Sequence, residues 1–158
     1  MYRIGQSQDI HRLKEGRKLI LCGVEIPFSK GLEGHSDADV ALHALTEAIL
    51  GALALGDLGH FFPDTDVQYK DADSSTFLLF AMKKMREKQY EISNIDLTIL
   101  AEEPKLAPYL IQMRKNISQW CLTDIENVSI KAGTKEKMDA VGKKEAIEAH
   151  CVVLLYSK

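Results

Sequence analysis

The sequence has few of the features that mark specialised classes of protein. Its 158 residues include three cysteines, four prolines and one tryptophan, and 20 basic side chains face 23 acidic ones, for a net charge of −3. Because nucleic-acid-binding proteins usually carry a basic excess, no nucleic-acid partner is expected. Cys22, Cys121 and Cys151 are odd in number and far apart, which predicts reduced, buried thiols. Such thiols are typical of the cytoplasm, or of a plastid-type organelle if a transit peptide was removed.

Long apolar runs are also scarce. The longest candidate, residues 38–55, is interrupted by Asp39, His43 and Glu47, whereas a membrane-spanning helix needs roughly 20 mainly apolar residues. We therefore expect no membrane span and no membrane partner. The apolar fraction of 46% and the charged fraction of 27% are those of a globular protein, and the length fits the usual size of one domain. The sequence predicts a single domain over residues 1–158.

Hydrophobic periodicity predicts the secondary structure of an α/β protein. Alternation of apolar and polar residues predicts strands, and apolar residues three or four apart predict helices. The expected strands cover residues 2–13, 18–27 (two strands and a turn), 91–101, 127–132 and 149–156. The expected helices cover residues 38–55, 74–88 and 106–120, residues 31–37 and 57–73 are expected loops, and 133–148 has no clear pattern. Three helices among these strands predict an α/β or α+β sandwich with the helices on one face of the sheet.

Two short patterns contain the residue types that hold metal ions. Asp9 and His11 stand two apart on a predicted strand, so they share a face and could be two ligands of zinc. On the next predicted helix, Asp39 and His43 are four residues apart and also share a face. His43 is either a third ligand or a histidine at the core edge that Asp39 satisfies. Spacing alone favours a surface polar pair for Asp9 and His11. It favours a histidine at the core edge, satisfied by Asp39, for His43.

Three predicted loops carry further polar groups. Residues 56–66 hold three carboxylates, two glycines and a proline, which suits a binding site or an ordinary turn. Residues 101–105 could present backbone amides to a base or a phosphate, or could only connect a strand to a helix. In residues 131–137, Thr134 and a lysine could hold phosphate and Glu136 could bind Mg²⁺, or the segment could be a solvated run of charges.

Taken in order, these segments resemble the 2-C-methyl-D-erythritol 2,4-cyclodiphosphate synthase family of the non-mevalonate isoprenoid pathway, over nearly the whole chain. The most specific motifs are His35-Ser36-Asp37-Ala38-Asp39-Val40-Ala41-Leu42-His43 and Phe62-Pro63-Asp64-Thr65-Asp66. The resemblance implies that 4-diphosphocytidyl-2-C-methyl-D-erythritol 2-phosphate is cyclised with release of CMP, its 2-phosphate attacking the β-phosphorus. It also implies a mixed sheet with three helices on one face, and a homotrimer in which the sheets face the axis and each active site lies between subunits.

The resemblance assigns roles residue by residue. Zn²⁺ would be held by Asp9, His11 and His43, and Mg²⁺ or Mn²⁺ by Glu136. The candidate catalytic residues are Thr134, Glu136 and His35. The candidate substrate-binding residues are Asp57 and Gly59 at the ribose, Ala101, Pro104, Lys105 and Leu106 at the cytosine and diphosphate, Thr134 at a phosphate, and His35, Ser36, Phe62 and Asp64 around the methylerythritol part.

The chain also departs from the family pattern. Gln8 and Ala140 stand where aromatic residues are common, and Lys143 stands in place of an arginine. These positions resemble those that hold an isoprenoid diphosphate on the trimer axis of some members. Lys143 is therefore a candidate ligand-binding residue, but lysine lacks the bidentate fork of arginine, so weak or absent binding is expected. Gly133 replaces a common threonine, and activity is expected to survive this loss.

Two other functions compete with the synthase. A non-catalytic trimeric nucleotide-binding protein on the same scaffold would lack a metal ligand or Glu136, and the sequence retains them. A zinc-dependent hydrolase of nucleoside diphosphate conjugates would release CMP together with a linear product instead of a cyclic one.

Overall fold

The computed structural model describes residues 1–157, which are built around a mixed β-sheet. Within this range five strands follow the order β4-β1-β7-β5-β6, and β2 and β3 form a separate hairpin. β5 and β6 run parallel, whereas β4–β1, β1–β7 and β7–β5 are antiparallel. The strands are β1 (Tyr2–Glu15), β2 (Leu19–Leu21), β3 (Val24–Ile26), β4 (Lys30–Leu32), β5 (Glu91–Leu100), β6 (Val128–Gly133) and β7 (Ala146–Tyr156).

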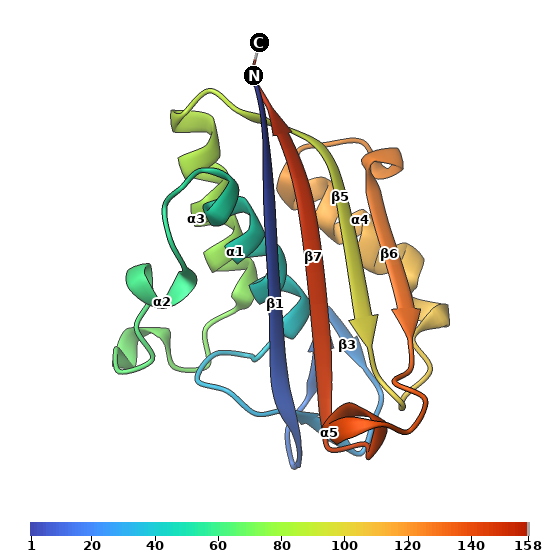
Figure 1. Ribbon diagram of the computed structural model, residues 1–158. Coiled ribbons are helices and arrows are strands. Elements are labelled where there is room, and N and C mark those ends of the chain that lie inside the picture. Colours follow the sequence, from blue (N-terminus) through green and yellow to red (C-terminus); the bar gives the residue numbers. More distant parts are fainter. Residues whose placement is uncertain (158) are drawn as a thin grey trace.

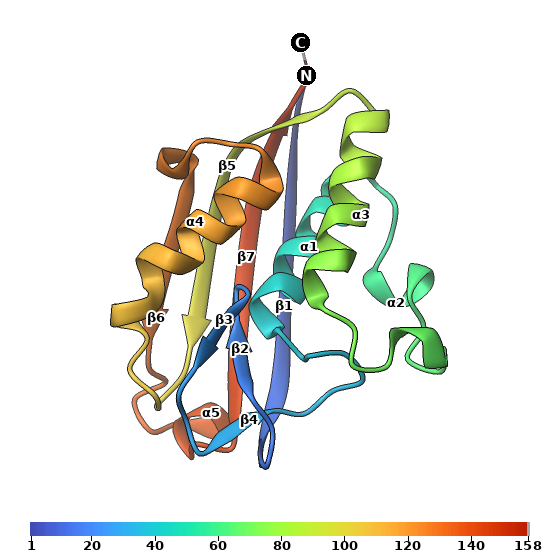
Figure 2. The same ribbon diagram turned by 180° about the vertical axis from the view of Figure 1, so that it is seen from behind.

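Three main helices cover one face of the sheet and leave the other face open (Figures 1 and 2). These are α1 (Val40–Ala52), α3 (Ser74–Glu87) and α4 (Leu110–Cys121). α1 packs on β1 and β7, α4 packs on β6, and α3 packs on α1. Two short helices, α2 (Leu58–Phe61) and α5 (Asp139–Gly142), lie in the connections. The predicted class, a mixed sheet with three helices on one face, is confirmed.

The core lies between the helices and the sheet, and α1 is its centre. Ten of the thirteen residues of α1 are buried, because the helix is covered by the sheet on one side and by α3 on another. In β5 and β7 buried residues alternate with more exposed ones, as a sheet with one covered face requires. The packing of α1 on the covered face of the sheet therefore positions the residues of β1 that face this helix.

Two element boundaries differ from those expected. Residues 30–32 form β4, paired with the end of β1, where a loop was expected from residue 31. A side chain at Gly31 would collide with the backbone oxygens of Arg17 and Lys18, and pairing also buries Leu32 completely. α1 begins at Val40, two residues later than expected.

The remaining differences lie in the connections. The third helix begins at Leu110 rather than at residue 106, because a 3₁₀ turn over Ala107–Tyr109 contains Pro108, which has no backbone N–H to continue an α-helix. The expected loop 57–73 contains α2 and a 3₁₀ turn over Val67–Tyr69. The segment without a clear pattern contains α5 and the first three residues of β7, which begins at Ala146 rather than at residue 149.

The cysteines agree with the expectation of reduced, buried thiols. Cys22, Cys121 and Cys151 are free and buried. Burial raises the pKa of all three thiols, so they stay protonated and unreactive near neutral pH. No helix within residues 1–157 is long and apolar enough to span a membrane.

The contact between β1 and α1 depends on a glycine. A Cβ atom at Gly5 would lie 1.8 Å from the backbone oxygen of Ala48 and 2.9 Å from the Cβ of Ala52. Strand and helix can approach this closely because residue 5 has no side chain. The approach matters for the site, since the next residues of β1 on the same face meet the same helix.

We expect Gly5→Ala to destabilise the protein by about 1–3 kcal/mol or more, because the backbone of α1 must move to admit the methyl group. Gly51→Ala is the matched control within α1: that position is exposed and has no neighbouring atom within 4 Å of the added Cβ. It should stabilise the protein by about 0.5–1 kcal/mol through helix propensity. Urea unfolding of both variants measures the two effects, and equal stability would contradict the packing argument.

Candidate metal centre and substrate cavity

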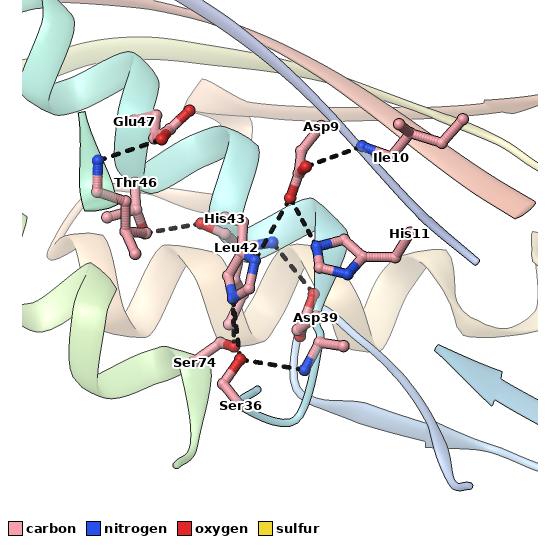
Figure 3. A network of polar contacts seen from close by, with 12 residues as sticks. Asp9, Ile10, His11, Ser36, Asp39, Leu42, His43, Thr46, Glu47 and Ser74 are labelled. Carbon is pink, nitrogen blue, oxygen red and sulfur yellow. Dashed lines mark hydrogen bonds and ion pairs between the residues drawn. The ribbon is translucent and has the colours of Figure 1, made fainter. Parts of the chain in front are cut away.

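Three potential metal ligands converge from β1 and α1 (Figure 3). Asp9 and His11 lie on the face of β1 that packs against α1, and His43 lies on the facing side of that helix. Asp9 Oδ2 is 2.9 Å from His11 Nε2 and 3.4 Å from His43 Nδ1. One ligand atom from each residue lies within 4.8 Å of the other two. This group of a carboxylate and two imidazoles is a possible metal-binding site.

The outer nitrogen of each imidazole has its own partner. His11 Nδ1 is 2.8 Å from the backbone oxygen of Glu33, which leaves Nε2 facing Asp9. His43 Nε2 is 2.9 Å from Ser74 Oγ and 3.2 Å from Ser36 Oγ, which leaves Nδ1 facing Asp9. Metal-binding histidines typically use one nitrogen for the metal and donate the other N–H to a neighbouring oxygen. The donor set and its surroundings therefore fit a divalent metal ion.

The charges within the group favour cation binding. Burial would raise the pKa of Asp9, but its hydrogen bonds with His11 and His43 outweigh burial and hold that pKa well below its ordinary value. Burial lowers the pKa of His11, but its hydrogen bonds with Asp9 and with the Glu33 carbonyl outweigh this and raise it. Asp9 is therefore an anion at neutral pH, and the positive charge it attracts can be a proton on His11 or a metal ion.

Asp39 does not satisfy His43, contrary to the simpler interpretation of their spacing. Its carboxylate is fully buried and accepts hydrogen bonds from the backbone N–H groups of Cys22, Gly23 and Leu42, at 3.0, 2.8 and 3.1 Å. Burial raises its pKa to about 6, against the opposing effect of those three hydrogen bonds. Asp39 caps α1 and joins the start of the helix to the β2–β3 turn. Its role is structural: it fixes the end of α1 that carries His43.

Asp39→Ala should cost roughly 3–5 kcal/mol of unfolding free energy, because a helix cap is lost and two N–H groups of the β2–β3 turn, the buried one of Cys22 and the partly buried one of Gly23, lose their acceptor. Asp73→Ala provides the comparison, since the exposed Asp73 caps α3 through Ser75 N alone. That variant should lose about 1 kcal/mol. Chemical unfolding of the two variants compares them, and similar losses would contradict this account of Asp39.

A cavity of about 320 Å³ opens beside the metal group. Its lining includes predicted site residues from three parts of the chain: Asp9 and His11, then His35, Ser36 and His43, then Gly59, Phe62 and Asp64. Phe62 also packs on Phe77 and Tyr69, with ring centroids 4.7 and 5.0 Å apart, so the loop after α2 is held against α3. The structure thus brings together the ligand triad and the residues expected around the methylerythritol part.

The position of α2 sets one wall of this cavity. Asp57 caps α2 by accepting a hydrogen bond from His60 N at 2.9 Å and is exposed next to the cavity. Glu47, one turn beyond His43 on α1, accepts hydrogen bonds from Leu58 N at 3.1 Å and from Ser7 Oγ at 3.0 Å. A single carboxylate therefore holds both α2 and β1 against α1.

The other predicted site residues form a second group at the ends of β5 and β6. Ala101 N donates to Gly133 O at 2.9 Å, and Lys135 N donates to Glu102 Oε1 at 2.9 Å. The turn 101–106 and the loop with Thr134 and Glu136 therefore lie side by side. Ala101 and Leu106 are buried, and Pro104 is half-buried, whereas Lys105, Thr134 and Glu136 are exposed. Lys143 follows α5 and belongs to neither group.

The two groups do not meet within one chain. β1, which carries Asp9 and His11, is separated from β6 by β7 and β5. Three strand spacings correspond to roughly 14 Å across the sheet. One copy of the chain therefore presents a metal group with its cavity near one edge of the sheet, and the loop with Thr134 and Glu136 at the other edge.

Sequence reasoning missed three residues around the metal group: Glu47, Asp37 as a hydrogen-bonding partner, and Ser74. Glu47 could have been found, since it is four residues after His43 and therefore on the same face of α1. Ser74 belongs to another helix, and no local pattern relates it to residue 43. Its hydroxyl becomes visible as a partner of His43 only in the folded chain.

Comparisons with known proteins show the family of this chain. A model of the YgbB family matches residues 2–156. The chain belongs to the YgbB family. A relative from Brachyspira hyodysenteriae, named 2-C-methyl-D-erythritol 2,4-cyclodiphosphate synthase, is 57% identical over 153 residues, or 97% of each chain.

Solved structures are similar to this chain in fold as well as in sequence. One from Plasmodium falciparum, described as an IspF CDP complex, superposes with a TM-score of 0.88 at 36% identity, over 99% of this chain and 97% of that one. The bifunctional IspDF of Campylobacter jejuni superposes with a TM-score of 0.96 at 40% identity over all of this chain, which spans only 43% of that longer protein. The mixed sheet with its helices is thus the fold of these solved structures.

Proposed function

We propose that this chain is a 2-C-methyl-D-erythritol 2,4-cyclodiphosphate synthase. Its reaction is the closure of 4-diphosphocytidyl-2-C-methyl-D-erythritol 2-phosphate to the cyclic diphosphate, with release of CMP. The observation that carries the proposal is the triad of Asp9, His11 and His43 at the wall of a cavity of about 320 Å³. The name shared by the relatives supports the same reaction.

The triad suits zinc, which takes nitrogen and oxygen ligands and leaves a fourth position open in catalytic sites. A zinc ion held there would withdraw charge from a substrate phosphate and favour its reaction. His11 and His43 would bind it through the nitrogens that face Asp9, and Glu33 and the two serines hold the rings in that orientation. Ser36, Phe62 and Asp64 enclose the methylerythritol part next to the triad, and His35 is held by a hydrogen bond to Asp66 O at 2.9 Å.

The nucleotide end of the substrate belongs to the second group. Exposed Glu136 supplies carboxylate oxygens for Mg²⁺ or Mn²⁺, Thr134 bonds a phosphate oxygen, and Lys105 adds a positive charge. Because Ala101 and Leu106 are buried, the turn recognises cytosine through backbone groups. The ribose is met from the first group, by Asp57 and Gly59 beside the metal cavity. The attacking oxygen is part of the substrate, so no protein nucleophile is required, and catalysis consists of positioning and charge neutralisation.

A homotrimer accounts for the separation of the two groups. The metal group and the Glu136 loop lie near opposite edges of the sheet, so neither alone holds the whole substrate. A cyclic, head-to-tail arrangement of copies would set the metal group of one subunit against the nucleotide group of the next. The open face of the sheet, with exposed Ile4 and Ile10 on β1, would then face the axis (Figure 1).

The product decides between this function and hydrolysis. Purified protein with Zn²⁺ and Mg²⁺ is incubated with the substrate, and phosphorus NMR with mass spectrometry identifies what forms. A synthase yields equal amounts of CMP and the eight-membered cyclic diphosphate. CMP with a linear product would instead establish the hydrolase, and absence of any turnover with bound nucleotide would favour the non-catalytic protein.

Sharing of the site between subunits predicts complementation. We expect co-expressed His43→Ala and Glu136→Ala chains, each inactive alone, to regain about one quarter of the wild-type activity, since a functional site needs an intact metal group from one chain and an intact Glu136 from its neighbour. The quarter applies to the unseparated mixture. Affinity tags of two kinds isolate the mixed trimers, in which one of the three sites is intact, so their activity should be about one third of the wild-type value. Light scattering gives their mass. Mixed trimers without activity would show that both groups must come from one chain.

A further inference from the structure

Behind the metal triad, a serine and a carboxylate form a chain of hydrogen bonds to His43. Ser74 is the first residue of α3, is fully buried, and lies 2.9 Å from His43 Nε2 through its Oγ. The same hydroxyl donates a short hydrogen bond to Asp37, whose other oxygen accepts Ser74 N at 3.0 Å. Asp37 also accepts the N–H of Asp39, at 3.0 Å. The chain therefore runs from Asp37 in the loop before α1, through Ser74 at the start of α3, to the ring of His43. Figure 3 shows its last link, between Ser74 and His43.

The direction of these hydrogen bonds follows from their donors and acceptors. An ionised carboxylate can only accept, so the hydroxyl proton of Ser74 points to Asp37. Ser74 Oγ then presents a lone pair to His43, and the only group that can satisfy it there is an N–H at Nε2. A neutral imidazole with its proton on Nε2 has a free lone pair on Nδ1, which is the nitrogen that faces Asp9.

Ser36 cannot enforce this arrangement by itself. Its Oγ is 3.2 Å from His43 Nε2 and accepts Ala38 N at 3.2 Å, but no carboxylate fixes its proton. The hydroxyl of Ser36 can therefore donate to Nε2 as well as accept from it. A ring that accepts at Nε2 carries its proton on Nδ1, and that tautomer cannot bind a metal through Nδ1.

We propose that Ser74, fixed by Asp37, is a positioning residue that holds His43 in the tautomer and orientation needed for metal binding. The inference rests on the proposed function only in taking the triad as a zinc site. Ser74 is not needed to cap α3, because the Asp73 carboxylate already caps this helix by accepting a hydrogen bond from Ser75 N at 2.9 Å. The hydroxyl of Ser74 is directed away from the helix backbone, to Asp37 and to His43.

The test compares zinc affinity in Ser74→Ala and Ser75→Ala, two adjacent serines in the first turn of α3. Competition with a chelator that reports free zinc gives the dissociation constant without any assay of activity. We expect Ser74→Ala to bind zinc about 10–100-fold more weakly, the usual effect of losing the hydrogen-bond partner of a metal-bound histidine. Ser75→Ala, which keeps every contact of the triad, should bind like the wild type.

The Nε2 proton of His43 gives a second readout in the zinc-loaded protein. In the wild type, NMR should show this proton protected from exchange by Ser74, and in Ser74→Ala it should exchange much faster. Asp37→Asn should weaken zinc binding as well, because an amide no longer dictates where the serine proton points. It also tests the chain of hydrogen bonds if Ser74→Ala proves unstable.

The possible failures are distinguishable. If wild-type protein does not bind zinc, or binds it without forming the cyclic product, the proposed function is wrong. If the wild type binds zinc and Ser74→Ala binds it equally tightly, or loses no more than Ser75→Ala, the positioning role is overturned and the function stands. Unchanged affinity in Asp37→Asn beside a loss in Ser74→Ala would remove Asp37 from the proposal.

Discussion

Replacement of His43 by alanine is expected to abolish tight zinc binding and to lower the rate of cyclisation by more than roughly 10³-fold. Loss of one hydrogen-bond donor to a developing charge costs about 10²–10³ in rate, and a metal ion neutralises more charge than one donor does. With His43 absent, Asp9 and His11 offer two ligands where a catalytic zinc site supplies three. Metal analysis after dialysis and the rate of CMP release measure the two losses.

The chain should remain folded, since His43 is at the edge of the core and its neighbours Leu42 and Leu45 keep their packing. His60→Ala is the control, because this exposed imidazole on α2 lies outside the triad and should leave zinc content and rate near the wild-type values. Circular dichroism confirms that both variants are folded. Full zinc occupancy in His43→Ala would mean that the ligand set is wrong.

How much of this site the sequence predicts depends on whether the partners are local. Asp9 and His11 could be paired from strand alternation, and their 2.9 Å contact bears that out. His43 could be placed on a helix, but the same rule paired it with Asp39. The structure turns Asp39 into the core instead, where its carboxylate accepts three backbone N–H groups, from Cys22, Gly23 and Leu42, rather than meeting the imidazole of His43. Helical spacing shows which residues share a face of a helix, but it does not show which residues of other elements contact that face.

The fold, too, was predicted where the signal is local and missed where it depends on distant contacts. The long strand β1 and the helix α3 were predicted almost to the residue, since both have strong periodicity over more than ten positions. The three-residue strand β4 was missed, because its pairing with Leu13 and Glu15 and the lack of space beside Gly31 arise from the folded chain. The contacts that make the site, from Ser74 to His43 and from Glu47 to Leu58, likewise join segments that are far apart in sequence or in different elements.

The second large effect is expected at Glu136. We expect Glu136→Gln to reduce activity by on the order of 10²–10³-fold, because the neutral amide holds Mg²⁺ or Mn²⁺ poorly and the charge of the diphosphate is then not neutralised. Zinc content should not change, since Glu136 is not one of the three ligands of the triad. The measurement is the rate of CMP release as a function of Mg²⁺ concentration, with zinc analysed in parallel.

The choice of glutamine separates charge from backbone geometry. Glu136 has a φ of 51°, in the left-handed region, so substitution by a residue of another shape could alter the loop as well as the ligand. Glutamine keeps the length and branching of the side chain, and Glu136 N retains its hydrogen bond to Thr134 Oγ1 at 3.3 Å.

Glu145→Gln, at an exposed position just before β7, controls for the loss of one negative charge and should retain wild-type activity. A wild-type Mg²⁺ dependence in Glu136→Gln would show that the second cation is held by other groups, and the nearby carboxylate of Glu102 is committed to Lys135 N and Lys137 N. The combination of intact zinc and lost Mg²⁺ response is therefore specific to a cation held by Glu136.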